Sequence, residues 1–264
     1  MKKTKIISFI IAIGLVLGFV SVGLGKYGAK NSKNTAYNFP VKTGTDEWKK
    51  FNSHDEMVNA TQIPANVIDS MTTRALYLSC LDYPLFGDMF AFNSLNQGFE
   101  NFYNNFNGLR EFLGRPDASD VVLQEYQATD LNSYSSHYRN WEKDLFDEKT
   151  KVSANKDAMF FSSIVFLEIL IAQPEIYNVS SSTEDIFLKK VEKNLKQKNQ
   201  LFDVYGGNSQ DSATLAIENI LKAKGLLKEE EKVTEQKSLE NSSKQPFNDY
   251  MTWLMKKTDN YLGN

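Results

Sequence analysis

Four carboxylate side chains are the groups in this sequence that are best suited to acid–base chemistry. Two acids that face one cavity can hydrolyse a glycosidic bond, one as the proton donor and the other as a base or nucleophile. Their separation along the chain does not show whether any two of them face each other, so a paired-carboxylate site is one hypothesis among several. The candidate catalytic residues are Asp82, Asp88, Glu111 and Glu168.

Two of these acids also have ordinary structural interpretations. Asp88 lies in the stretch CLDYPLFGDMFAFN, and an ion pair with Arg110 or Arg115 would fix the angle between this stretch and the helix that follows it. Glu168 stands alone in a strongly apolar segment, where it would face an arginine or a lysine, or point outward at the edge. A functional acid is the alternative interpretation of Glu168.

A second set of polar residues suits binding rather than catalysis. Residues 95–113 carry uncharged amides of poor helix propensity beside aromatic rings. Amides can bind sugar hydroxyls while a ring stacks on the face of the sugar, although asparagines of this kind are more often simply solvated. The candidate binding residues are Asn101, Tyr103, Asn104, Asn105 and Arg110.

Metal and cofactor chemistry find little support in the sequence. The two histidines, His54 and His137, lack a partner at His-x-x-x-His or Glu-x-x-His spacing, so no metal site is expected and a capping or surface role is the ordinary one. The only cysteine, Cys80, lies beside Leu76 and Leu81 on an apolar face and is interpreted as a small buried hydrophobe. Phosphate-binding loops and nucleophile motifs are absent from the sequence, and no cofactor is expected.

The candidate binding residues lie on the clearest helical pattern of the chain. Six large apolar residues recur at steps of four and three, which predicts one helix of about 19 residues with a single apolar stripe. A kink is expected at Asn107-Gly108, and Gly114 stops the helix. The stripe consists of Leu95, Phe99, Phe102, Phe106, Leu109 and Leu113.

The other elements are also helical in pattern. Capping boxes at Ser53 and Ser94 begin two helices, and Pro84 ends the helix that carries Cys80. Residues 157–172 are apolar nearly all round and predict the central buried helix. No convincing strand pattern is present, so the predicted fold class is all-α, an irregular orthogonal helical bundle. Further helices are expected around residues 134–145, from a cap at Thr183 to a stop at Gly206-Gly207, and around residues 212–224.

The N-terminal residues have the pattern of an export signal. Lys2, Lys3 and Lys5 precede an uncharged, mostly apolar run from Ile6 to Leu24, which places the later residues outside the cytoplasm. The run of about 19 residues is also long enough to span a bilayer, so cleavage and retention as an anchor are both open. The expected segments are 1–25 signal peptide or membrane anchor, 26–45 flexible tether, 46–227 helical domain, 228–245 charged linker or solvated helix, and 246–264 C-terminal amphipathic helix.

The charge balance argues against nucleic acid as a partner. The whole chain has a net charge of −3, and without residues 1–25 it keeps 27 basic and 33 acidic side chains. Its single cysteine can form no internal disulfide, which suits a Gram-positive bacterium better than a disulfide-rich animal secretion.

Residues 43–118 resemble a module of uncharacterised exported proteins of Gram-positive bacteria. The shared motifs are T-G-T-x-E-W, Q-I-P, Y-P-L, A-F, G-F, F-N-G-L and R-x-D-A. The resemblance implies a bacterial surface or secreted setting. It carries over no activity and no catalytic residue, and residues 119–264 lie outside it.

Together these patterns predict an exported, non-enzymatic protein of the cell envelope, secreted or anchored on the extracellular face of the cytoplasmic membrane. Its expected partner is an extracellular protein, peptide or glycan, with no nucleic acid and with membrane contact only through residues 1–25. The alternative is a secreted hydrolase that uses paired carboxylates on a cell-wall or host polymer. A structural spacer is the third hypothesis, favoured if the C-terminal helix is detached and the surface has neither cleft nor apolar patch.

Overall fold

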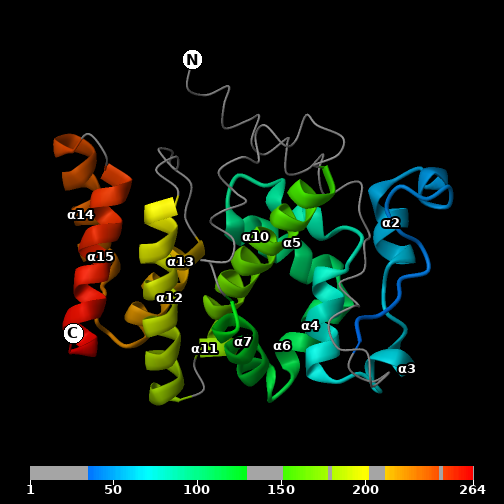
Figure 1. Cartoon of the computed structure of the whole chain (residues 1–264), viewed down its shortest axis with the longest axis horizontal. Helices are drawn as coiled ribbons and strands as arrows, with labels where there is room; N and C mark the ends of the chain where they lie inside the picture. Colours follow the sequence, from blue (N-terminus) through cyan, green and yellow to red (C-terminus); the bar gives the residue numbers. More distant parts are fainter. Residues whose placement is uncertain (1–34, 130–150, 178–179, 202–211, 244–245, 264) are drawn as a thin grey trace. The chain divides into compact units, whose positions relative to one another are not determined.

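The computed structural model describes residues 35–129, 151–177, 180–201, 212–243 and 246–263 (Figure 1). Regular structure in these residues is helical throughout, without a strand, so the predicted all-α fold of irregular helices is confirmed. The predicted signal or anchor segment and the predicted helix that contains His137 lie outside the described residues. Within the described part of the chain, no helix has both the length and the apolar character that crossing a membrane requires.

The chain divides into two compact units, which are considered one at a time. Of the described residues, unit 1 contains 35–121 and 151–163, and unit 2 contains 122–129 and those from 164 onward. The segment boundaries expected from the sequence at residues 46, 228 and 246 stay predictions.

Unit 1 is built from short helices whose starts are set by side-chain caps. The Ser53 hydroxyl accepts a hydrogen bond from the backbone N–H of Glu56, and the Ser94 hydroxyl accepts one from that of Gln97, as the two capping boxes predict. The helices are η2 (Trp48–Lys50), α2 (His54–Ala60), α3 (Ala65–Ile68), α4 (Thr73–Leu81), η3 (Phe86–Phe90), α5 (Leu95–Asn105) and α6 (Asn107–Gly114), with the first residues of α7 (Ala118–Gln127) and of α10 (Lys151–Ile171).

The single helix predicted for residues 95–113 is two helices in the structure. The backbone of Phe106 is extended, with φ −128° and ψ 114°, and it separates α5 from α6 one residue before the expected kink. The break changes the rotational phase of the second helix. As a result Phe112 is fully buried, whereas Leu113, which the apolar stripe predicted to be inside, is only half-buried.

The side chains of Gln62 and Asn107 form hydrogen bonds with backbone groups at and opposite this break between the helices. The Gln62 side chain accepts from the backbone N–H of Asn107 at 3.0 Å and donates to the carbonyl oxygen of Asn105 at 2.9 Å. The Asn107 side chain accepts from the backbone N–H of Ile63 at 3.1 Å and donates to its carbonyl oxygen at 2.7 Å. Backbone groups that would be costly to bury alone are therefore paired, and the segment after α2 is fixed to the α5–α6 junction.

An aromatic cluster fills the centre of unit 1. The Tyr83 ring stacks on Phe106 at a centroid distance of 4.1 Å and on Phe102 at 5.4 Å. Burial raises the pKa of the Tyr83 hydroxyl to about 12. Tyr83 and Phe86 of the CLDYPLFGDMFAFN stretch are thus buried in the same core as Phe102 and Phe106, while Phe90 is half-buried and Phe92 is exposed.

Unit 2 packs the apolar faces of longer helices against one another. Residues 164–172 of the chain are buried, nearly all of them apolar, as expected for the predicted central helix. Phe187, Val191 and Leu195 of α12 are fully buried, as are Ile217 and Ile220 of α13. The helices of this unit are α11 (Pro174–Tyr177), α12 (Ser181–Leu201), α13 (Ser212–Ala223), α14 (Glu229–Ser242) and α15 (Pro246–Leu262), with the last residues of α7 and α10.

The C-terminal helix α15 docks on its own unit. Tyr250, Met251 and Leu254 are buried, and α15 contacts α12, α13 and α14. Two polar links add to this packing: Lys196 pairs with Asp259 at 3.4 Å, and the Tyr261 hydroxyl donates to Asp185 at 3.0 Å. The charged helix α14 has no buried residue, so the solvated helix was the better of the two expectations for this segment.

Candidate functional site

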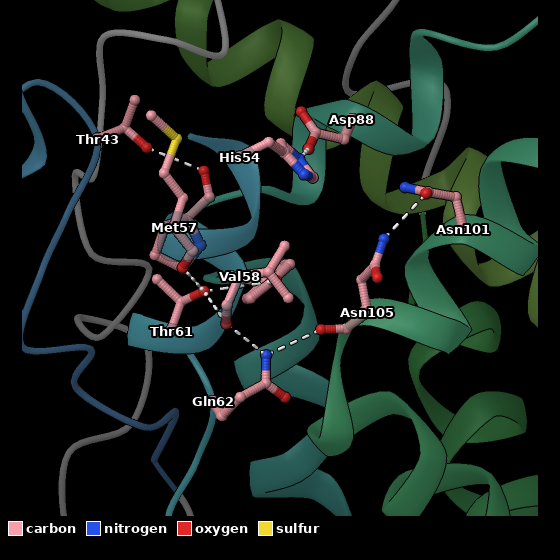
Figure 2. Close-up of polar contacts among 11 residues, drawn as sticks. Thr43, His54, Met57, Val58, Thr61, Gln62, Asp88, Asn101 and Asn105 are labelled. Atoms are coloured by element: carbon pink, nitrogen blue, oxygen red, sulfur yellow. Dashed lines mark hydrogen bonds and ion pairs between the residues drawn. The ribbon is translucent and has the colours of Figure 1, made fainter. Parts of the chain in front are cut away.

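A small open pocket in unit 1 collects several of the predicted site residues. It is shallow, with a volume of about 10 Å³, which is room for about one water molecule. Figure 2 shows His54 and Asp88 meeting on one side of it and Asn101 and Asn105 on the other. The lining residues are His54, Val58, Tyr83, Leu85, Asp88, Asn101, Phe102 and Asn105.

Helical spacing explains how these side chains reach one place. His54 opens α2 because Ser53 caps it, and Val58, four residues later, lies on the same face. Asn101 and Asn105 are likewise four residues apart on one face of α5. Asp88 lies in η3, a short 3-10 helix that packs against α5.

Asp88 pairs with His54 rather than with an arginine. The imidazole Nε2 donates to the carboxylate Oδ2 at 2.6 Å, and the two side chains are 50% and 38% exposed. The predicted pair with Arg110 or Arg115 is therefore wrong. Both guanidinium groups donate to other acceptors instead. These are backbone carbonyl oxygens for Arg110, and a backbone carbonyl oxygen and a neighbouring carboxylate for Arg115.

The partners of the two arginines explain this correction. Arg110 donates to the carbonyl oxygens of Tyr103 and Asn104, both at 2.8 Å, and so satisfies the end of α5. Arg115 pairs with Glu111 at 2.7 Å and also donates to the carbonyl oxygen of Ile68. Arg110 and Glu111, both candidate site residues, thus have structural contacts outside the pocket.

The two asparagines of the pocket orient each other. The Asn105 Nδ2 donates to the Asn101 Oδ1 at 2.9 Å. Within the described residues, this leaves the Asn101 Nδ2, the Asn105 Oδ1 and the Asp88 Oδ1 without a protein partner. The pocket therefore offers one amide donor and two acceptors beside the apolar side chains of Val58, Leu85 and Phe102.

The remaining candidates do not line this pocket. Tyr103 and Asn104 of α5 are exposed and do not line the pocket with Asn101 and Asn105. Asp82 is half-buried; its burial raises its pKa, and Lys42 opposes that shift. Cys80 is fully buried, which raises its pKa and confirms the interpretation as a small hydrophobe.

Glu168 lies in the core of unit 2. It is fully buried, so the expectation that it points outward at the edge is wrong. The Tyr126 hydroxyl donates to its Oε1 at 2.9 Å, and the Ser212 hydroxyl donates to its Oε2. Hydroxyl donors from α7 and α13 thus hold this carboxylate in the interior.

Sequence reasoning gave His54, Gln62 and Asn107 no site role. His54 and its acceptor are 34 residues apart, and the capping box placed the histidine only in a first helical turn. Gln62 and Asn107 fall within the Q-I-P and F-N-G-L motifs, and these motifs could have indicated that both residues have a structural role. Among the described residues, no group of three histidine, cysteine, aspartate or glutamate side chains could hold a metal ion.

The His54–Asp88 contact should contribute modestly to stability. Because both side chains are partly exposed, we expect a double-mutant cycle with His54→Ala and Asp88→Ala to give a coupling of about 0.5–1 kcal/mol. Urea unfolding of the four proteins measures it. The Asp46–Lys49 pair, 86% and 68% exposed, is the matched control and should show coupling close to zero. Equal coupling in the two pairs would contradict the expectation.

The lining of the pocket does not provide the two carboxylates of a paired-acid hydrolase. Its one carboxylate, that of Asp88, is hydrogen-bonded to the His54 imidazole, and the lining contains no second acid.

Comparisons of the chain with protein-family models, with curated proteins and with solved structures found no match.

Proposed function

We propose that this chain is an exported, non-enzymatic helical protein of the cell envelope that binds a partner through the pocket of unit 1. The partner is an extracellular protein, peptide or glycan. The N-terminal basic and apolar pattern supports export, followed by secretion or anchoring outside the cytoplasmic membrane. Membrane contact is confined to residues 1–25.

One observation carries the binding proposal over the hydrolase alternative. A paired-acid hydrolase needs two carboxylates on one cavity, roughly 5–10 Å apart. In unit 1 the pocket has Asp88 alone, while Glu111 is paired with Arg115 and Asp82 does not line the pocket. Polar groups without protein partners, placed at the rim of a concave apolar surface, are what a binding site requires.

The docked C-terminal helix argues against a simple spacer. Its buried face and its polar links to α12 hold α15 on unit 2, and unit 1 has a defined pocket. A spacer was favoured only if the C-terminal helix were detached and the surface had no cleft, so both features argue against it.

Retention on cell walls tests the proposal. Full-length chain, kept soluble in a mild detergent, is incubated with isolated Gram-positive cell walls, either intact or stripped of protein by protease. We expect saturable sedimentation of the chain with the walls and no release of soluble wall fragments. Asp88→Ala should weaken retention about tenfold, because a charged acceptor is lost, whereas Asn104→Ala should not.

The outcomes separate the alternatives. Release of wall fragments that Asp88→Asn abolishes would favour the hydrolase. Retention that is unsaturable, or equal for wild type and Asp88→Ala, would contradict binding through this pocket. Loss of retention after protease treatment would assign the partner to protein rather than glycan.

A further inference from the structure

Helix α14 turns a polar face toward the rest of unit 2. It contacts α15, and none of its own residues is buried (Figure 1). The half-buried side chains of α14 share one face at helical spacing, and they are Lys232, Glu235, Gln236 and Leu239. Only one of these four side chains is apolar. Because the burial of an apolar face is what normally holds a helix in a bundle, polar contacts must hold α14 in place.

Two partly exposed ion pairs hold the first turn of α14. Lys222, in the last turn of α13, pairs with Glu229, and its hydrogen bond lowers the pKa of the Glu229 carboxyl. Lys257 of α15 pairs with Glu231 at 2.6 Å. Attraction between such charges weakens with salt, because the screening length falls from about 14 Å at 50 mM to about 4 Å at 0.5 M. Both links are therefore sensitive to ionic strength.

A third ion pair of α14 reaches into unit 2. Lys232 pairs with the Oε2 of Glu218, a side chain of α13 that is only 3% exposed. The Glu218 Oε1 accepts a hydrogen bond from the Tyr250 hydroxyl at 2.9 Å. Burying this ion pair removes both charges from water, so its net contribution to stability is smaller than its close contact suggests. When α14 opens, Lys232 returns to water and the Glu218 Oε2 becomes open to solvent.

The neighbouring helices have contacts of their own that do not involve α14. Helix α15 buries Tyr250, Met251 and Leu254, and it contacts α12 and α13 as well as α14. The ion pair of Lys196 with Asp259 also joins α15 to α12. Opening of α14 thus breaks ion pairs but exposes little apolar surface, and the rest of unit 2 can stay folded.

We propose that α14 is a salt-sensitive strap, which opens as one unit when its ion pairs are screened and thereby exposes the Glu218 carboxylate. Helices α12, α13 and α15 stay folded in the open state. Unit 2 thus carries an acidic group whose exposure follows the ionic strength of its surroundings. The proposal concerns unit 2 alone and is independent of the pocket of unit 1.

Amide hydrogen exchange of the full-length chain in a mild non-ionic detergent, followed by mass spectrometry, tests the strap. Between 50 mM and 0.5 M sodium chloride, we expect exchange of the α14 amides to accelerate about fivefold, because two partly exposed ion pairs are weakened. Helices α12 and α13 are the internal references. Their exchange should not accelerate, since salt does not weaken the burial of apolar side chains.

Variants of two lysines locate the effect. Lys232→Met removes the inner ion pair but keeps an unbranched side chain, and it should accelerate exchange in α14 at least tenfold at 50 mM salt. Lys237→Met is the matched control, because it makes the same substitution at an exposed position of the same helix, outside the three ion pairs. It should change exchange by no more than about twofold.

A double variant separates opening of α14 from unfolding of its unit. Lys232→Met leaves the buried Glu218 charge without its lysine, which can loosen α13 as well. Glu218→Gln in the same chain removes that charge and keeps an acceptor for Tyr250. We expect the double variant to have wild-type exchange in α13 and still to have fast exchange in α14.

Each contrary result overturns the strap. Equal acceleration of α13 and α14 by salt would show that the unit opens as a whole. Exchange of α14 that is unchanged or slower in salt would assign its contact to apolar packing. Equal effects of Lys232→Met and Lys237→Met would show that the inner ion pair does not hold the helix. Fast exchange in α13 of the double variant would make α14 an integral part of the unit.

Discussion

Replacing Gly98 with alanine should lower the free energy of unfolding by about 2–3 kcal/mol. Gly98 lies on the buried face of α5, where a Cβ atom would be 1.8 Å from the carbonyl oxygen of Met89 and 2.8 Å from its carbonyl carbon. Because both obstacles are backbone atoms, no side-chain rotation removes the clash. The better helix propensity of alanine returns only about 1 kcal/mol, so the overpacking dominates.

Urea unfolding of the full-length chain, followed by circular dichroism and by amide hydrogen exchange in α5, measures this effect. Gly114→Ala is the matched control, because a Cβ there meets nothing within 4 Å. We expect it to change stability by no more than about 0.5 kcal/mol. Equal midpoints for the two variants would show that α5 and η3 do not approach as closely as described.

The same contact also matters for the pocket. Gly98 allows α5, which carries Asn101 and Asn105, to lie directly against η3, which carries Asp88. Asn101 is less than one helical turn from Gly98, so a displaced helix would move its amide away from the carboxylate. A glycine without polar chemistry thereby sets the geometry of the candidate site.

Local features of the fold were predictable because their causes lie within a few residues. In the caps at Ser53 and Ser94, the serine hydroxyl accepts from the backbone N–H three positions later, and both caps are confirmed. Helical geometry also separates the binding candidates. Residues two positions apart point about 200° away from each other on a helix, so Tyr103 shares no face with Asn101 or Asn105.

The α5–α6 break was not predictable from periodicity. The apolar steps of four and three continue through Phe106, so the pattern is equally compatible with one helix. What stabilises the break is the pairing of Asn107 with Gln62 and Ile63, more than 40 residues earlier in the chain. Contacts at that separation are decided by tertiary packing.

The partner of Asp88 was missed for a related reason. Sequence reasoning favoured an arginine because a guanidinium is a permanent cation that suits a carboxylate. In the structure the nearby carbonyl groups at the end of α5 take Arg110, and Glu111 takes Arg115. The start of α2 then brings His54 to the free carboxylate.

Glu168→Ala should have the largest effect on unit 2, a loss of about 3–5 kcal/mol in the free energy of unfolding. The substitution leaves a cavity at a fully buried position. It also removes the acceptor for two hydroxyl groups, those of Tyr126 and Ser212, which then stay buried without this partner. Urea unfolding of the full-length chain, with hydrogen exchange in α10 and α13, provides the measurement.

Glu168→Gln separates this structural role from the functional acid considered for the residue. Glutamine keeps the volume and one carbonyl oxygen that can accept from Tyr126, so we expect a smaller loss of about 1–2 kcal/mol. Residues kept for chemistry commonly reduce stability, and their replacement raises it. A Glu168→Gln variant more stable than the wild type would contradict the structural role, because it would show that the hydrogen bonds to the carboxylate do not outweigh the cost of burying it.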